Sequence, residues 1–173
     1  TGWAFTSRAY AYRVSGYQIE RSFAVPATST DEYLVVNAQR AHVLGAELES
    51  LWRLSPTITL RALAGLTQAT LQAFTDPFTK VSYSGNRAPY APSGNAALQF
   101  DYVAESGFFC GAGATWTGRT FYDEQESASF SQAGYTLLEA RAGYTYARLE
   151  FRAFGRNLTS QKYYSSITPG VFH

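Results

Sequence analysis

Acidic side chains offer the first chemistry to consider in this chain. Glu47 and Glu49 lie two residues apart, so in a strand both carboxylates share a face, as acid–base catalysis would need. The run 123–126, Asp-Glu-Gln-Glu, has oxygen ligands suited to a divalent cation. For the Glu pair we favour a structural wall of ion pairs, because basic residues are expected on the neighbouring strand. For the acidic run we favour a solvated loop end, so no catalytic site and no metal site is expected.

A second group of residues suits ligand binding rather than catalysis. Asn86 and Arg87 are flanked by Tyr83 and Tyr90. Arginine supplies fixed donors to carboxylate or catecholate oxygens, and tyrosine supplies flat aromatic faces. The competing interpretation is a loop anchor, in which nearby prolines set the entry into the next strand. Both interpretations place these residues in a long loop.

Composition excludes several classes of function. The net charge of +1 gives no electrostatic argument for nucleic-acid binding. The single Cys110 permits no internal disulfide, and His42 and His173 are too far apart to form a metal-binding motif, so no cofactor is expected. No apolar run approaches the ~20 residues of a membrane helix, and no signal peptide is seen. Because the chain lacks Met and opens on Thr1, we interpret it as a piece of a longer protein.

The elements that would position these residues are seven strand-like segments. They lie near residues 3–23, 33–54, 57–74, 93–104, 108–122, 135–146 and 149–158. The connections alternate between short links, at 54–56, 105–107 and 147–148, and long ones, at 24–32, 75–92 and 123–133. Short turns at one rim and long loops at the other are typical of a transmembrane β-barrel.

Alternate positions within these segments differ in character. One phase, which includes Leu48, Ala64 and Ala112, carries no charge and has aromatic residues beside the short links. Trp116 lies eight residues beyond Phe108, roughly 20 Å at a ~40° tilt and close to the ~25 Å apolar band of a barrel. The pattern favours a membrane barrel with its apolar phase in lipid over a soluble lectin-like sandwich. The opposite phase carries nine charges: Glu47, Glu49, Arg53, Arg61, Asp101, Glu139, Arg141, Glu150 and Arg152.

Turn lengths predict which residues face each other across neighbouring strands. The expected opposite pairs are Ala104–Phe108, Tyr102–Cys110, Glu49–Arg61, Tyr144–Phe151 and Glu139–Arg156.

Two local features of the strands are also expected. We expect Gly111 and Gly113, on the charged phase, to clear space for a plug or a crossing side chain. In the first segment, a bulge near Ser15-Gly16 would reconcile its two alternating phases; otherwise the upper half of this segment stands clear of the membrane.

Three local motifs resemble one protein family. Residues 37–49, NAQRAHVLGAELE, are similar to the "NA…A…G-x-E-x-E" strand of TonB-dependent outer-membrane receptors. Residues 85–92, GNRAPYAP, are similar to that family's entry into the next descending strand. Residues 154–164, FGRNLTSQKYY, resemble its C-terminal signature, in which Asn157, Leu158 and Tyr163 hold the motif positions. Asn157 is expected to be structural, with its side chain bonding local backbone where the strand leaves the wall.

The resemblance implies a fold and a function for the whole chain, residues 1–173. The fold would be an all-β, antiparallel transmembrane barrel of 22 strands, of which this chain supplies about seven, without the plug domain, the TonB box or the closing strand. The function would be uptake of a scarce ligand, most often a ferric siderophore, across the outer membrane of a Gram-negative bacterium. A passive, porin-like channel is the alternative.

The resemblance also implies partners and assigns the polar residues to places in a barrel. The partners would be the TonB–ExbB–ExbD complex, outer-membrane lipid and lipopolysaccharide, and a small metal chelate. Ligand contacts are expected in an extracellular loop, at Tyr83, Asn86, Arg87 and Tyr90. Structural charges are expected on the inner wall, at Glu47, Glu49, Arg61, Glu139, Arg141 and Arg156.

Overall fold

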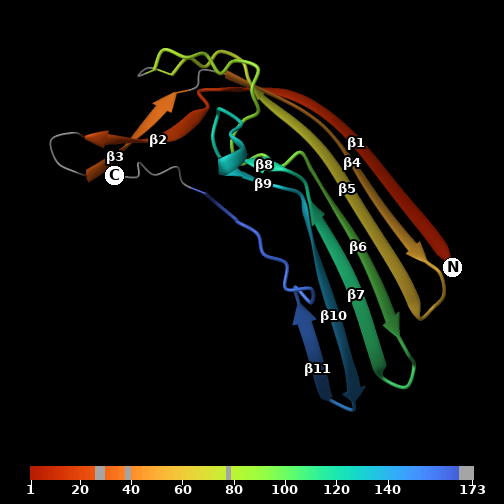
Figure 1. Cartoon of the computed structure of the whole chain (residues 1–173). Coiled ribbons are helices and arrows are strands. Elements are labelled where there is room, and N and C mark those ends of the chain that lie inside the picture. Colours follow the sequence, from red (N-terminus) through yellow and green to blue (C-terminus); the bar gives the residue numbers. More distant parts are fainter. Residues whose placement is uncertain (26–29, 38–39, 77–78, 168–173) are drawn as a thin grey trace.

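The computed structural model describes residues 1–25, 30–37, 40–76 and 79–167, and its main feature is one seven-stranded antiparallel sheet (Figure 1). The strands follow the order β1-β4-β5-β6-β7-β10-β11, and all neighbours pair antiparallel. No helix in the described part is long and apolar enough to cross a membrane. The strands are β1 (Gly2–Ser15), β4 (Arg40–Arg53), β5 (Ile58–Leu71), β6 (Gly94–Val103), β7 (Phe108–Thr117), β10 (Tyr135–Tyr146) and β11 (Leu149–Arg156).

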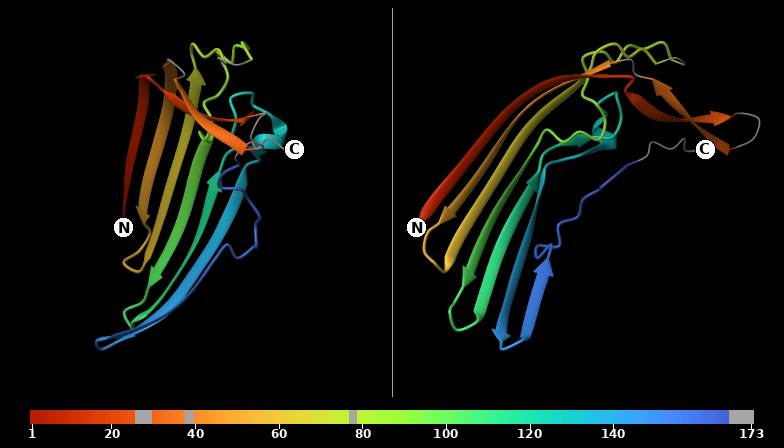
Figure 2. Two further views of the ribbon diagram at one scale, coloured as in Figure 1. Left: turned by 90° about the vertical axis from the view of Figure 1, so that its left-hand side faces the viewer. Right: turned by 180° about the vertical axis from the view of Figure 1, so that it is seen from behind.

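Short turns and long loops lie at opposite ends of this sheet, as the alternating link lengths predict (Figures 1 and 2). Four short strands sit in the long-loop region: β2 (Gln18–Val25) pairs with β3 (Thr30–Asn37), and β8 (Thr120–Phe121) pairs with β9 (Ser131–Gln132). A 3-10 turn, Ala128–Phe130, precedes β9. Two of the expected segments, 57–74 and 108–122, are longer than the strands observed, because β5 ends at Leu71 and β7 ends at Thr117.

The predicted registers are confirmed at two of the three short turns. Tyr102 faces Cys110, and the Ala104 N–H donates to the Phe108 carbonyl at 2.8 Å. Across the tight turn at 147–148, the opposite pairs are Tyr144 with Phe151 and Glu139 with Arg156, as expected.

The third expected register, Glu49 opposite Arg61, is wrong. Glu49 faces Leu63, and Arg61 faces Leu51. The turn is wider than three residues because the N–H groups of Leu54 and Ser55 both donate to the Ile58 carbonyl, at 3.0 and 3.4 Å. The slip is by two residues, so each side chain keeps its face of the sheet.

The register sorts the sheet into two faces. The apolar face is defined by lateral rows such as Leu48–Ala64–Ala96–Trp116, and Ala112 and Ala140 on it are exposed rather than packed in a core. The charged face is the other side and carries Glu47, Arg61, Asp101, Arg141 and Arg156. This separation follows from the two-residue period of each strand and from a register that places residues of the same face opposite one another on neighbouring strands.

At the long-loop end the first hairpin bends away from the sheet (Figure 1). Gly16 adopts a φ of +69°, which L side chains rarely adopt, and β1 ends just before it. Ser15 faces Arg40, and three residues further on Gln18 faces Asn37, so the register does not shift across the break. The expected bulge is therefore wrong, and the first segment is divided by a bend instead.

The buried apolar cluster of the described residues also lies at the long-loop end, on the charged face. Val43, Ala69 and Leu71 come from β4 and β5, and Phe74 and Ala88 come from the loop that follows β5. Leu71 is completely buried and Phe74 is 2% exposed. The 72–93 loop thus folds over the charged face and converts its upper part into a small core, where burial of apolar surface stabilises the loop.

Opposite sides of one strand should respond differently to a new charge. Leu98 lies on the apolar face and its neighbour Ala97 on the charged face. If the apolar face is in lipid, Leu98→Arg should destabilise the protein by about 2–4 kcal/mol, with Ala97→Arg costing much less. Urea unfolding in lipid vesicles measures both. Equal losses would contradict the assignment of the faces.

Candidate functional site

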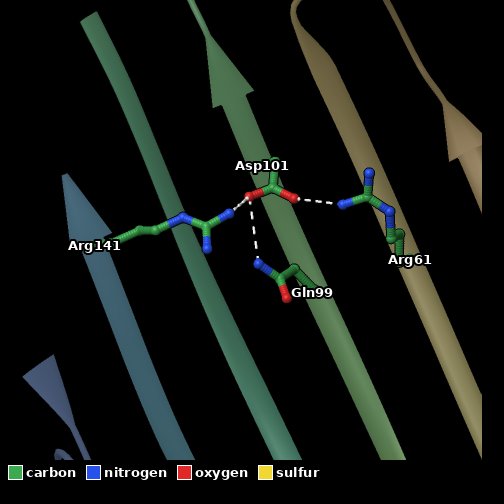
Figure 3. Close-up of polar contacts among 4 residues, drawn as sticks. All are labelled: Arg61, Gln99, Asp101 and Arg141. Atoms are coloured by element: carbon green, nitrogen blue, oxygen red, sulfur yellow. Dashed lines mark hydrogen bonds and ion pairs between the residues drawn. The ribbon is translucent and has the colours of Figure 1, made fainter. Parts of the chain in front are cut away.

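The charged face is organised around one carboxylate, that of Asp101 on β6 (Figure 3). Its Oδ2 accepts from Arg61 Nη1 on β5 at 2.9 Å, and its Oδ1 accepts from Arg141 Nη2 on β10 at 2.5 Å. Gln99 Nε2 donates to Oδ1 at 3.4 Å. The Asp101 side chain is 15% exposed, so these pairs are shielded more than ordinary surface ion pairs.

Arg141 reaches Asp101 across a strand that carries no side chain at the crossing point. Asp101 faces Gly111 on β7, and Gly111 faces Arg141 on β10. A Cβ added at Gly111 would lie 2.9 Å from Asp101 Oδ1 and 3.3 Å from Arg141 Nε. Gly113 makes similar room for Glu139, whose Cγ would lie 3.1 Å away. The expectation that a glycine clears space for a crossing side chain is confirmed at Gly111, and at Gly113 the space is taken by the side chain of the neighbouring Glu139.

The other predicted wall charges are placed on the same face, but not as one cluster. Glu47 pairs with Arg8 on β1 at 4.0 Å, and Arg156 lies over the Phe154 ring at 5.8 Å. Sequence reasoning placed Asp101 on the charged phase but did not name it as a site, and it missed Arg8. The signal for Asp101 was a lone acid on β6 with Arg61 on β5 to one side and Arg141 on β10 to the other, two strands away, which is evident only once the strand order is known.

At the long-loop end, two of the predicted ligand residues tie two loops together. The Asn86 amide donates to the Glu124 carbonyl at 2.8 Å, and the Arg87 N–H donates to Glu126 Oε1 at 2.7 Å. Both bonds join the β5–β6 loop to the β7–β10 loop. The Asn86 bond therefore agrees with the interpretation of Asn86 as a loop anchor.

The four predicted ligand residues do not point to one place. Tyr83 is half-buried against Phe74, with ring centroids 6.1 Å apart. Arg87 bridges to Thr70 on β5, and register partners share a face, so Arg87 belongs to the apolar side of the sheet. Tyr90 is 53% exposed and is the more accessible of the two tyrosines. Ligand contact by Tyr83, Asn86, Arg87 and Tyr90 stays a prediction.

Tyrosines dominate the rim around Tyr90. Its ring meets Tyr122 edge-on, with centroids 5.3 Å apart. The buried Tyr122 hydroxyl donates to the Tyr164 carbonyl at 2.5 Å. Burial raises the pKa of Tyr122, with Tyr135 and Tyr90 adding to the shift, so this hydroxyl stays a neutral donor at physiological pH.

The C-terminal motif residues hold the chain where it leaves the sheet. β11 ends at Arg156, and Asn157 then takes a φ of +49°, which asparagine tolerates. Its side chain accepts from the Gln161 N–H at 2.8 Å and donates to the Gln161 carbonyl at 3.1 Å, so its expected structural role is confirmed. The Leu158 N–H donates to the Leu138 carbonyl at 3.0 Å, and Tyr163 stacks on Tyr135 at 4.4 Å.

The acidic run at 123–126 is not a solvated loop end, and that expectation is wrong. Asp123 is 5% exposed and Glu124 is 2% exposed. Asp123 Oδ1 accepts from the Ser127 N–H at 2.9 Å, closing the loop on itself. Among the described residues, no group of three His, Cys, Asp or Glu side chains is placed to hold a metal ion. The run therefore acts as internal loop structure.

A sheet with these two faces and this division of short turns and long loops defines a wall segment of a membrane β-barrel. A sequence model of the family described as "TonB dependent receptor-like, beta-barrel" matches residues 1–158. The chain belongs to this family, which is one of transport receptors rather than enzymes.

Solved structures share the fold. The siderophore receptor PiuA from Acinetobacter baumannii has a TM-score of 0.72 at 17% identity, covering 94% of this chain and 23% of that one. The ferric-catecholate import receptor Fiu from K12 E. coli has a TM-score of 0.67 at 22% identity, covering 95% and 22%. The copper transporter OprC has a TM-score of 0.70 at 14% identity, covering 94% and 24%. This chain thus spans about a quarter of the length of these structures.

The crossing point at Gly111 can be tested by adding one methyl group. Gly111→Ala puts a Cβ against Asp101 and against the Phe100 carbonyl, also 2.9 Å away. We expect a loss of about 1–3 kcal/mol from overpacking and a displaced ion pair. Gly65→Ala is the matched control, because the three atoms nearest its Cβ all belong to the Asn95 side chain, the nearest at 3.1 Å. Urea unfolding compares them, and equal stability would exclude a special role for Gly111.

Loop anchoring by Asn86 has its own test. Asn86→Ala removes the bond to Glu124, so we expect a local loss of about 1 kcal/mol and faster protease cleavage in the 72–93 loop without any ligand. Asn95→Ala, at an exposed position on the charged face of β6, is the control. Cleavage rates that match the control would refute the anchor.

Proposed function

We propose that this chain is part of the barrel wall of an outer-membrane receptor that imports a scarce ligand with energy from TonB. The family match over residues 1–158 carries this proposal. The apolar face would meet the hydrocarbon and the charged face the barrel interior. The membrane would be the outer membrane of a Gram-negative bacterium, because barrels with short turns at one rim and long loops at the other occur there.

The proposed cargo is a ferric siderophore or a similar iron complex. Support comes from the similar structures, among which are a siderophore receptor and a ferric-catecholate import receptor. The long loops would gather this chelate, and the exposed ring of Tyr90 is the surface best placed to contact it. Tyr83 and Asn86 would act by holding that loop in place.

The energy source and its route are the second part of the proposal. The TonB–ExbB–ExbD complex would act on the N-terminal part of the receptor, and a rearranged plug would release cargo along the charged face. The Arg61–Asp101–Arg141 group would keep that face rigid by joining β5, β6 and β10. This chain performs no bond chemistry in the process.

A deletion strain complemented with the full-length gene tests the transport function. Growth on a ferric siderophore under iron limitation should be restored, and restoration should disappear when TonB is also deleted. Uptake that persists without TonB and rises linearly with ligand concentration would favour a passive channel instead.

Ligand capture is tested with purified receptor and ferric siderophores. Tyr90→Ala should weaken binding roughly tenfold, because an exposed aromatic contact is lost. Tyr146→Ala is the matched control, since Tyr146 is 69% exposed and belongs to the opposite, short-turn rim. Fluorescence titration gives both affinities. Equal affinities would remove Tyr90 from the capture site and leave TonB-dependent transport untouched.

A further inference from the structure

Side chains hold part of the segment that follows β11. Figure 1 shows this segment running from the end of β11 toward the long loops, and residues 160–164 belong to no strand. The Tyr164 N–H donates to Gln132 Oε1 at 2.9 Å, and the Tyr164 carbonyl accepts from the Tyr122 hydroxyl at 2.5 Å. The ring of Tyr163 adds a contact with Tyr135 at the start of β10.

The rings of Tyr135 and Tyr163 lie face to face. Their centroids are 4.4 Å apart, and their planes are inclined by 13°. Aromatic pairs usually have centroids ~4.5–7 Å apart in offset or edge-on arrangements, so this pair lies at the close end of the range. The rings of Tyr90 and Tyr122 are 5.3 Å apart and inclined by 64°. The stacked pair is therefore better placed than the edge-on pair for a reaction that joins two rings.

The stacked rings are also accessible to small molecules. Tyr163 is 41% exposed, and Tyr135 is half-buried. Tyr135 is the first residue of β10, and its partner Thr117 is the last residue of β7, so the pair lies at the long-loop end of the sheet. Two phenols are thus held against each other at a place that a small oxidant can reach.

We propose that Tyr135 and Tyr163 form a modification site, at which hydrogen peroxide and a haem peroxidase join the two rings as dityrosine. Each phenol loses one electron and its hydroxyl proton, which gives two phenoxyl radicals. The radicals couple through a carbon–carbon bond between the ring carbons next to the hydroxyl-bearing carbons. The hydrogens on the coupled carbons then leave as protons, and both oxygens regain a proton. In total, two electrons and two protons pass to one molecule of hydrogen peroxide, which becomes two molecules of water.

This cross-link would fasten the C-terminal segment to the sheet. The hydrogen bonds and the ring contact that hold residues 163 and 164 can break and form again, whereas a carbon–carbon bond cannot. A covalent link also removes conformational freedom from the open state of the segment, as a disulfide does in an unfolded chain. The inference goes beyond the proposed function, because the modification requires neither cargo nor TonB.

The site is tested on purified full-length receptor in detergent, treated with a haem peroxidase and hydrogen peroxide. Trypsin cleaves after Arg119, Arg141 and Lys162, so Tyr135 lies in the peptide 120–141 and Tyr163 begins the peptide that follows Lys162. Tandem mass spectrometry should find these two peptides joined between Tyr135 and Tyr163, with a mass lower than their sum by two hydrogen atoms. A sample without peroxide is the blank.

Conservative variants decide whether this pair is the site. Tyr163→Phe keeps a ring for stacking but cannot form a phenoxyl radical, so we expect complete loss of the joined peptides, and Tyr135→Phe should give the same loss. The matched control is Tyr164→Phe at the neighbouring, 66% exposed position, which should leave the yield unchanged. Circular dichroism checks that each variant keeps its β-structure.

Three results would overturn the proposal. The first is a wild-type receptor that gives no joined peptides after oxidation. The second is a link that forms equally well in Tyr163→Phe, which would place the reaction at another tyrosine. The third is a yield that falls when the receptor is diluted, because the link would then join two molecules rather than two rings of one chain.

Discussion

Every strand of this chain depends on satisfying its backbone hydrogen bonds while its two faces meet different surroundings. Backbone groups have no water partner in hydrocarbon, so each strand must pair with a neighbour along its length. The seven strands do so in an unbroken antiparallel order. Side chains can then differ freely between the faces, because the period of two separates them without disturbing the pairing.

The two faces exchange character at the long-loop end. On the apolar side, Arg13, His42 and Thr70 form one lateral row of basic and polar residues. On the other side, the 72–93 loop covers β4 and β5, so Val43 and Leu71 replace charges and become buried. The covering loop thus accounts for the small core, whereas the polar row lies on the opposite face at the same end of the sheet.

The Asp101 group shows how the charged face gains lateral rigidity. Backbone pairing joins only adjacent strands, whereas Arg141 on β10 reaches over β7 to β6. That reach requires Gly111, because any larger residue would occupy the path. Since Asp101 also holds Arg61, a single carboxylate connects three strands. The arrangement adds side-chain connections to the backbone pairing of these strands.

The amino-acid sequence by itself determined the local features: seven strands, two faces, the registers at the tight turns, and the role of Asn157. These follow from the period of two and from turn chemistry, which act over a few residues. Only the tertiary structure decided the rest. Asp101 meets Arg61 and Arg141 from 40 residues away on each side, the acidic run is buried by contacts from another loop, and the wide turn at Leu54 moves Glu49 away from Arg61. Such contacts depend on strand order and loop packing, which join residues that no local pattern relates.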